Sequence, residues 1–251
     1  MIAVILFILG TIIGSFLNVV IYRLKHEQSF LKGRSYCPHC RKTLGFWDLV
    51  PIFSFIFLRG RCRYCGQKIS WQYPLVELAT GLAFLLPYLQ FDLTPRFYFT
   101  AVISCFLIII FVYDWRYYLI LDEVVVPAIV LAVIFAIFFA PNQFADYLWG
   151  GIIGGGFFLI QYLVSSGKWI GGGDIRLGLL MGLVLGVGKV LLALFIAYLL
   201  GALVSVILLA VKKKTMKSQI PFGTFLSLAT VIALLYGDQL IAWYKTFIGF
   251  Y

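Results

Sequence analysis

Long apolar segments alternate with shorter polar ones along the 251-residue chain. A helix needs roughly 20 apolar residues to cross the hydrocarbon core of a bilayer. Eight segments reach or approach that length, and they predict an all-α polytopic membrane protein with about eight transmembrane helices. The shortest of the eight is the sixth. The expected spans are residues 2–22, 72–90, 97–113, 123–140, 147–166, 177–188, 190–211 and 220–236.

The first apolar segment is too long for the core of a signal peptide. It also lacks a basic start and a small-residue cleavage site, so we expect a retained span. A polar insert, residues 23–71, separates it from the second span. Within the insert, residues 49–58 are apolar but too short to cross a membrane. They predict either a small core or a segment that lies on the membrane surface.

The composition agrees with this pattern, because 63% of the residues are hydrophobic and only 12% are charged. A soluble globular protein is about half apolar and a quarter charged. The chain also has 24 glycines, which suit close helix contacts in a bilayer. Its net charge of +10 could indicate a nucleic-acid partner, but the placement of the charges offers another explanation.

Lysine and arginine near span ends tend to stay in the cytoplasm. With eight spans, 17 of the 20 basic residues fall in the insert or in loops on its side of the membrane. This asymmetry predicts a cytoplasmic insert and termini outside the cytoplasm, and it explains the charge without nucleic acid. Six or seven spans remain an alternative. The 17 residues are Arg23, Lys25, Lys32, Arg34, Arg41, Lys42, Arg59, Arg61, Arg63, Lys68, Arg116, Lys168, Arg176, Lys212, Lys213, Lys214 and Lys217.

Two cysteine pairs in the insert predict a metal site. Cys37 and Cys40 form one CxxC motif, Cys62 and Cys65 form the other, and 21 residues separate the pairs. This spacing is close to that of a zinc ribbon. Four thiolates suit tetrahedral Zn²⁺ and leave no position for a catalytic water, so the predicted zinc is structural. Two disulfides are the alternative, which the reducing cytoplasm disfavours.

Nearby residues refine this interpretation. Gly66 would permit a tight turn after the second cysteine pair, and Gly45 follows the first pair more loosely. His39 lies between two cysteines, and we interpret it as a bystander. Cys105 lies inside an apolar segment and is typical of a small packing residue.

Two aspartates end or begin apolar segments. Asp114 ends the third expected span, and Asp174 follows Gly171-Gly172-Gly173 just before the sixth. Eight spans place both at the cytoplasmic edge of the membrane. Glycine permits close backbone approach and dihedral angles that other residues avoid. A charged residue at such a position suggests a functional site.

Paired carboxylates share a proton, as in aspartic proteases. One takes a proton from water while the other protonates the leaving group, without a cofactor. Alternatively, each aspartate pairs with the arginine two residues later, Arg116 or Arg176. The glycines and the shared membrane side favour the catalytic pair. Asp122 and Glu123 are further acids that could shape the site or only solvate it.

Several motifs, taken together, resemble one family over nearly the whole chain. The motifs are Gly14-Ser15-Phe16-Leu17-Asn18, the two CxxC pairs, Tyr73-Pro74-Leu75-Val76-Glu77, Asp114 with Asp122, Gly171-x-Gly173-Asp174, and Pro221-Phe222-Gly223. With these motifs in this order, the chain is similar to bacterial type IV prepilin peptidases, membrane aspartyl proteases of the GxGD class.

The resemblance implies a peptidase in the bacterial inner membrane with its active site facing the cytoplasm. It would remove the basic leader of prepilins or pseudopilins by cleaving after glycine at a Gly-Phe type of junction. Asp114 and Asp174 would be the catalytic residues. Many members also methylate the new N-terminal residue with S-adenosylmethionine, and Gly14 and the cysteine insert are associated with that activity.

The resemblance divides the chain into a first transmembrane helix (1–22), a four-cysteine insert (23–71) and the peptidase helices (72–251). The sequence departs from the family pattern at Leu121, where proline is usual, at Arg176, where lysine is usual, and at Thr224, where proline is common. A non-enzymatic assembly protein that docks through its zinc insert and a methyltransferase without peptidase activity remain alternatives. The number of spans would also suit a transporter, but we see no internal repeat.

Overall fold

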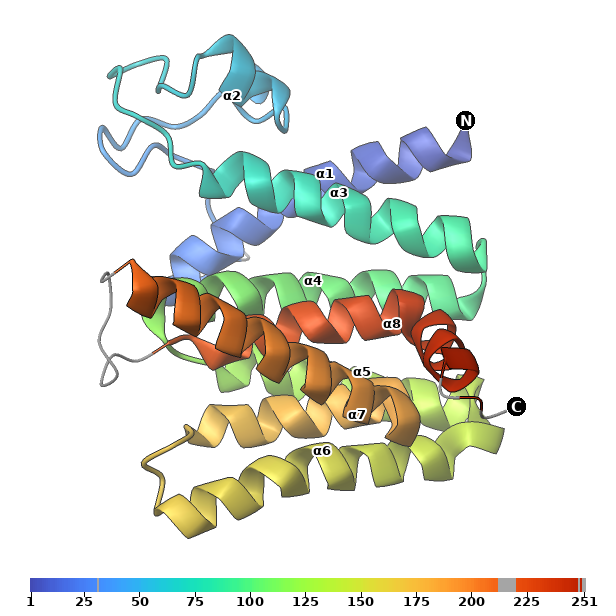
Figure 1. Cartoon of the computed structure of the whole chain (residues 1–251). Coiled ribbons are helices and arrows are strands. Elements are labelled where there is room, and N and C mark those ends of the chain that lie inside the picture. The colour runs from blue at the N-terminus through green and yellow to red at the C-terminus, as the bar shows by residue number, and fades with distance from the viewer. Residues whose placement is uncertain (31, 212–219, 248, 250–251) are drawn as a thin grey trace. The chain divides into compact units, whose positions relative to one another are not determined.

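The computed structural model describes residues 1–30, 32–211, 220–247 and 249. Within these ranges the chain is helical and contains no β-strand, which confirms the all-α prediction (Figure 1). Four of the basic loop residues, Lys212, Lys213, Lys214 and Lys217, lie outside the described residues. The helices are α1 (Ile2–Lys25), η1 (Phe46–Asp48), α2 (Phe53–Phe57), α3 (Gln72–Phe91), α4 (Pro95–Tyr117), α5 (Asp122–Phe139), η2 (Pro141–Gln143), α6 (Phe144–Ser165), α7 (Gly172–Ala210) and α8 (Phe222–Phe247).

Among the described residues, seven helices are long and apolar enough to cross a membrane. One of them, α7, has 39 residues and would be about 58 Å long if straight, roughly twice the hydrocarbon thickness. It is interrupted at Gly186, where φ is 75° and ψ is 177°. These angles are nearly exclusive to glycine and cannot continue a helix.

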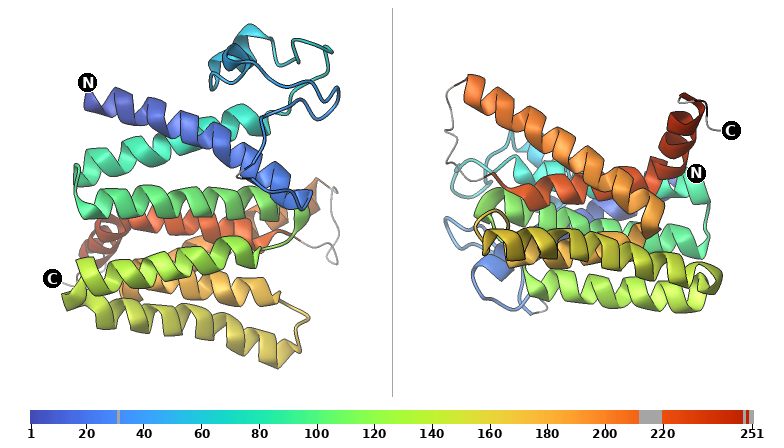
Figure 2. Two further views of the ribbon diagram at one scale, coloured as in Figure 1. Left: turned by 180° about the vertical axis from the view of Figure 1, so that it is seen from behind. Right: turned by 60° about the horizontal axis from the view of Figure 1, so that its bottom comes forward.

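The chain reverses direction at Gly186. A Cβ added to Gly154 of α6 would approach both Gly178 and Val190, which would be about 18 Å apart along a straight helix. Both can reach Gly154 only if α7 folds back into two arms, as Figures 1 and 2 show. The two arms correspond to the sixth and seventh expected spans, although the break comes slightly earlier than the sequence predicted.

Contacts within the chain divide it into two units, Met1–Ile109 and Ile110–Tyr251. In the first unit, α1 packs against α3 through glycines. A Cβ on Gly10 would lie 2.7 Å from the carbonyl oxygen of Thr80, and one on Gly14 would lie 2.7 Å from Cα of Glu77. Small residues at such positions let two helix backbones touch within a membrane.

Asn18 of α1 is also part of this helix contact. Its side chain is 1% exposed, and its amide nitrogen donates to the carbonyl oxygen of Tyr73, 3.1 Å away. The side-chain amide of Gln72 donates in turn to the Asn18 carbonyl oxygen at 3.2 Å. A polar residue inside an apolar span is therefore satisfied by the neighbouring helix.

The second unit contains the tightest helix packing, between α6 and the first arm of α7. A Cβ on Gly182 would lie 1.9 Å from the carbonyl oxygen of Gly150, and one on Gly178 would lie 2.5 Å from that of Gly154. Two glycines on each helix therefore bring the backbones together. This contact fixes the position of the first arm of α7, whose third residue is Asp174.

Candidate active site

Asp114 lies in the last turn of α4 and is 4% exposed. Its Oδ2 accepts a hydrogen bond from the backbone N–H of Thr224 at 2.7 Å and another from the Thr224 hydroxyl at 3.1 Å. Thr224 is in the first turn of α8. Free N–H groups at a helix N-terminus favour a negative charge, so the start of α8 supports the Asp114 carboxylate.

Asp174 is the third residue of α7 and is 9% exposed. Its Oδ2 accepts a hydrogen bond from the backbone N–H of Gly171 at 3.1 Å. The carboxylate thus caps the helix that carries it. This local bond fixes the Asp174 side chain at the N-terminus of α7.

The structure brings the two carboxylates together, close enough for their charges to interact. Ile120, in the loop after α4, lies between the segments that carry them. A Cβ on Gly173 would lie 2.8 Å from Cβ of Ile120, and one on Gly223 would lie 2.8 Å from Cδ1 of Ile120. The loop after Asp114, the start of α7 and the start of α8 therefore meet around one apolar side chain.

The three glycines before Asp174 have different roles. Gly173 needs to be small because of Ile120, whereas a Cβ on Gly172 would meet nothing within 4 Å. None of the three has a positive φ. The expectation that this segment uses dihedral angles that other residues avoid was therefore wrong. What requires a glycine is the close approach of Ile120 to Gly173.

Charge pairing near the site links different elements. Arg176 forms an ion pair with Asp122 at the start of α5, and both side chains are about half exposed. The pair thus joins the start of α5 to the first turns of α7. Sequence reasoning missed Thr224 as a partner of Asp114. The sequence signal for this partner was threonine at a position where proline is common in the family. A proline there could donate neither of the two hydrogen bonds.

The four cysteines of the insert form a second cluster. Their Sγ atoms all lie within 4.8 Å of one another, and those of Cys37 and Cys65 are 3.9 Å apart. Tetrahedral Zn²⁺ with Zn–S bonds of about 2.3 Å would place sulfurs about 3.8 Å apart. All four thiols are free rather than disulfide-bonded. The cluster could therefore hold a metal ion, and its donor set fits zinc.

Each cysteine pair sits on a matching turn. The backbone N–H of Cys37 donates to Lys42, and that of Cys62 donates to Gln67. The residue after the second cysteine has a positive φ in both turns, 59° at Arg41 and 70° at Gly66. The tight turn expected at Gly66 is present, but Arg41 rather than Gly45 occupies the equivalent position in the first pair.

The environment of Cys62 favours its thiolate. Burial opposes the charged form, but hydrogen bonds from the backbone of Tyr64 and Cys65 and from the thiols of Cys37 and Cys65 outweigh it, so the pKa of Cys62 falls to about 7. Thiolates are the metal-binding form. His39 is not among the clustered ligand atoms, and Cys105 packs beside the buried residues Phe97 and Ala101.

Gly14 has no room beside it for a cofactor. The nearest neighbours of an added Cβ would be Cα of Glu77, the hydroxyl oxygen of Thr80 and the carbonyl oxygen of Val76, all belonging to α3. The structure therefore places Gly14 in helix packing, and the residues around it do not fit S-adenosylmethionine.

Two protein families match consecutive parts of the sequence. Residues 8–91 match the bacterial peptidase A24 N-terminal domain, and residues 101–206 match the type IV leader peptidase family. A protein from Bacillus subtilis named prepilin leader peptidase/N-methyltransferase is 33% identical over 96% of both chains. This chain belongs to the type IV leader peptidase family. Its membrane helices and this membership make it a multi-pass protein of the inner membrane.

Further relatives of this leader peptidase carry the same name. The protein from Stutzerimonas stutzeri is 30% identical over 96% of this chain and 92% of its own length. The protein from Pseudomonas aeruginosa is 31% identical over 97% of this chain and 93% of its own length. No solved structure matches the chain. Membership in a family of enzymes favours the catalytic interpretation over a docking protein or a transporter.

Proposed function

We propose that this leader peptidase uses Asp114 and Asp174 to cleave the basic leader of prepilins or pseudopilins after glycine, at the cytoplasmic face of the inner membrane. The observation that carries the proposal is the meeting of two buried carboxylates within one unit of a chain from this family. Paired carboxylates suit water activation and leaving-group protonation.

The hydrogen bonds suggest a role for each carboxylate. Both carboxylates lie at a helix N-terminus, but Asp114 accepts two hydrogen bonds from Thr224 and Asp174 accepts one, from Gly171, so a negative charge is better supported on Asp114. We therefore assign Asp114 to take a proton from the water that attacks the scissile carbonyl carbon. Asp174, in its protonated form, would give its proton to the departing amine nitrogen, and the peptide C–N bond would break.

The cytoplasmic placement is supported by span parity. With the reversal at Gly186 counted as a turn between two spans, the insert, Asp114 and Asp174 all fall on the side where basic residues accumulate. A prepilin has a basic leader followed by an apolar helix. Its junction would reach the carboxylates at the membrane edge while its helix stays in lipid.

We also propose that the insert holds one structural zinc ion through Cys37, Cys40, Cys62 and Cys65, as their mutual spacing supports. The names of the relatives support a second activity, N-methylation of the new N-terminus, commonly phenylalanine. S-adenosylmethionine would supply the methyl group. We assign no residue to that step.

The test uses purified full-length protein in vesicles with a prepilin that carries a Gly-Phe junction, and mass spectrometry of the products. Asp114→Asn and Asp174→Asn should each reduce cleavage by about 100-fold or more. Asp122→Asn is the matched control, because its exposed carboxylate pairs with Arg176, and it should retain cleavage. Full cleavage by either catalytic variant would refute the paired-aspartate mechanism.

The same measurement tests methylation, because the mature N-terminus is read directly. With S-adenosylmethionine present, we expect the mature product to carry one added methyl group. An unmethylated product would leave this protein a peptidase only. If methylation needs no water-activating acid pair, either aspartate variant should still methylate a pilin supplied in mature form.

A further inference from the structure

The insert exposes a group of large apolar side chains. We call residues 46–58, which include η1 and α2, the aromatic segment; neither helix has a buried residue. Five of its side chains are more than 60% exposed: Phe46, Trp47, Phe53, Ile56 and Phe57. The segment is thus not the small core that the sequence allowed. A concentrated exposed apolar surface marks an interaction site.

One hydrogen bond fixes the position of the aromatic segment. The backbone N–H of Ile52 donates to Oε2 of Glu77 at 2.7 Å, and Glu77 is 7% exposed. Glu77 is five residues inside α3, a helix long and apolar enough to span a membrane. Its side chain leans toward the start of the helix, so the bond holds Ile52 beside the first turns of α3, where Figures 1 and 2 show α2.

The backbone at Ile52 indicates that this attachment is built into the fold. Ile52 has φ 62°, which is strained for a β-branched residue and persists only where the surroundings enforce it. The Glu77 carboxylate supplies such a constraint. Trp71, just before α3, contacts Phe55 with ring centroids 4.9 Å apart and adds a second attachment at the same end of the helix.

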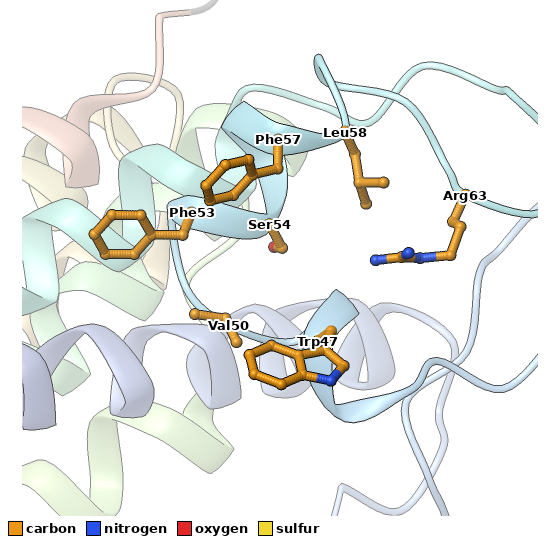
Figure 3. Close-up of a pocket in the computed structure, with 7 residues that line it drawn as sticks. All are labelled: Trp47, Val50, Phe53, Ser54, Phe57, Leu58 and Arg63. Atoms are coloured by element: carbon orange, nitrogen blue, oxygen red, sulfur yellow. The ribbon is translucent and has the colours of Figure 1, made fainter.

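A cavity of about 390 Å³ opens in the aromatic segment (Figure 3). Its lining is apolar apart from Ser54 and Arg63, and Nε of Arg63 already donates to Asp48 at 2.6 Å. A nucleoside-bearing cofactor would need several polar partners for its ribose and amine, whereas a lipid acyl chain needs none. The lining therefore favours lipid as the occupant.

We propose that the aromatic segment lies in the bilayer at the boundary between headgroups and acyl chains, and holds the cysteine insert against the membrane surface. Amphipathic interfacial segments combine such apolar faces with basic residues. Besides Arg63, which pairs with Asp48, three exposed basic residues follow the segment, Arg59, Arg61 and Lys68, and they suit anionic lipid headgroups. The first turns of α3 also expose apolar side chains, with Leu75 58% exposed and Leu78 41% exposed. This proposal is independent of the peptidase mechanism.

The test is quenching of tryptophan fluorescence by brominated lipids in vesicles that contain phosphatidylglycerol. The emission of Trp47 is isolated as the difference between the full chain and Trp47→Phe, and that of Trp71 in the same way. Bromines near the headgroups should remove on the order of half of the Trp47 emission, because interfacial side chains reach about 5–10 Å into the bilayer. The Trp71 signal serves as the reference for a residue at a span end.

Glu77→Ala should reduce the quenching of Trp47 severalfold, because the aromatic segment loses its hydrogen bond to α3 and keeps only the contact between Phe55 and Trp71. The quenching of Trp71, which adjoins α3, should change much less. Retained leader cleavage by Trp47→Phe would show that this variant folds. Trp47 emission that bromolipids leave intact in the full chain would overturn the proposal. Protection of Trp47 from acrylamide quenching by S-adenosylmethionine in vesicles would also overturn the proposal, because the cavity would then be a cofactor site.

Discussion

Replacing Gly154 with alanine tests whether the contact between α6 and α7 positions the active site. The new Cβ would lie 2.2 Å from the carbonyl oxygen of Gly178. A normal contact needs at least about 3.4 Å, so the two helices would have to separate by roughly 1 Å, and overpacking of this kind costs about 1–3 kcal/mol. Gly156→Ala on the same helix is the control, because a Cβ there would meet nothing within 4 Å.

The two substitutions should act in opposite directions. Alanine favours a helix over glycine by about 1 kcal/mol, so Gly156→Ala should be neutral or slightly stabilising. Gly154→Ala should lower the free energy of unfolding by up to about 2 kcal/mol, after the same propensity gain is subtracted from the overpacking cost. For a chain of this size, a loss of about 1 kcal/mol corresponds to about 2–4 °C in Tm.

Thermal unfolding in detergent and leader cleavage in vesicles provide the two measurements. Gly178 is one helical turn after Asp174, so separation of the helices should move that carboxylate and slow cleavage in Gly154→Ala, at temperatures where the variant remains folded. Gly156→Ala should cleave at the normal rate. Equal Tm values and equal cleavage rates for the two variants would show that the close glycine contact carries neither stability nor positioning.

Three further changes follow from the contacts. Thr224→Val keeps the backbone donor to Asp114 but removes the hydroxyl, so the cleavage rate should fall about tenfold, as for loss of a hydrogen bond to a charged group. Thr224→Ser should restore the rate, and equal rates for the wild type and both variants would contradict the role of the hydroxyl. Cys37→Ser should lower the zinc content of the purified protein from about one per chain, and metal analysis that finds no zinc in the wild type would refute the site. Gly186→Ala should reduce the free energy of unfolding by about 1–3 kcal/mol, because φ 75° and ψ 177° are nearly exclusive to glycine; an unchanged Tm would mean that the reversal tolerates a side chain.

The hydrophobic pattern was sufficient to predict the helical membrane fold, because span length is set by bilayer thickness. It was less informative about α7, where one apolar segment follows another with only Lys189 as a charged residue between them. The reversal depends on a backbone conformation at Gly186, and hydropathy does not report dihedral angles. The sequence therefore indicated two spans but placed the boundary a few residues late.

The insert shows a similar division between local and long-range information. Cysteine spacing predicted the cluster because ligands in two short turns are a local feature. The position of the aromatic segment depends on a bond between Ile52 and Glu77, 25 residues apart. No periodic pattern encodes such a bond, so the sequence left a small core and a surface segment as open alternatives. The left-handed backbone at Arg41 was likewise not predicted, because an arginine in the sequence does not indicate that conformation.

The aspartate site illustrates why a motif can be recognised before its physical reason is known. The glycines around Asp174 suggested an unusual backbone, yet the structure shows ordinary dihedral angles and a single close contact from Gly173 to Ile120. Gly223, much further along the chain, makes room for the same isoleucine and for the Asp114 carboxylate. The two glycines are therefore parts of one packing arrangement. A larger residue at either position would push against Ile120 and separate the loop after Asp114 from the helix that carries its partner.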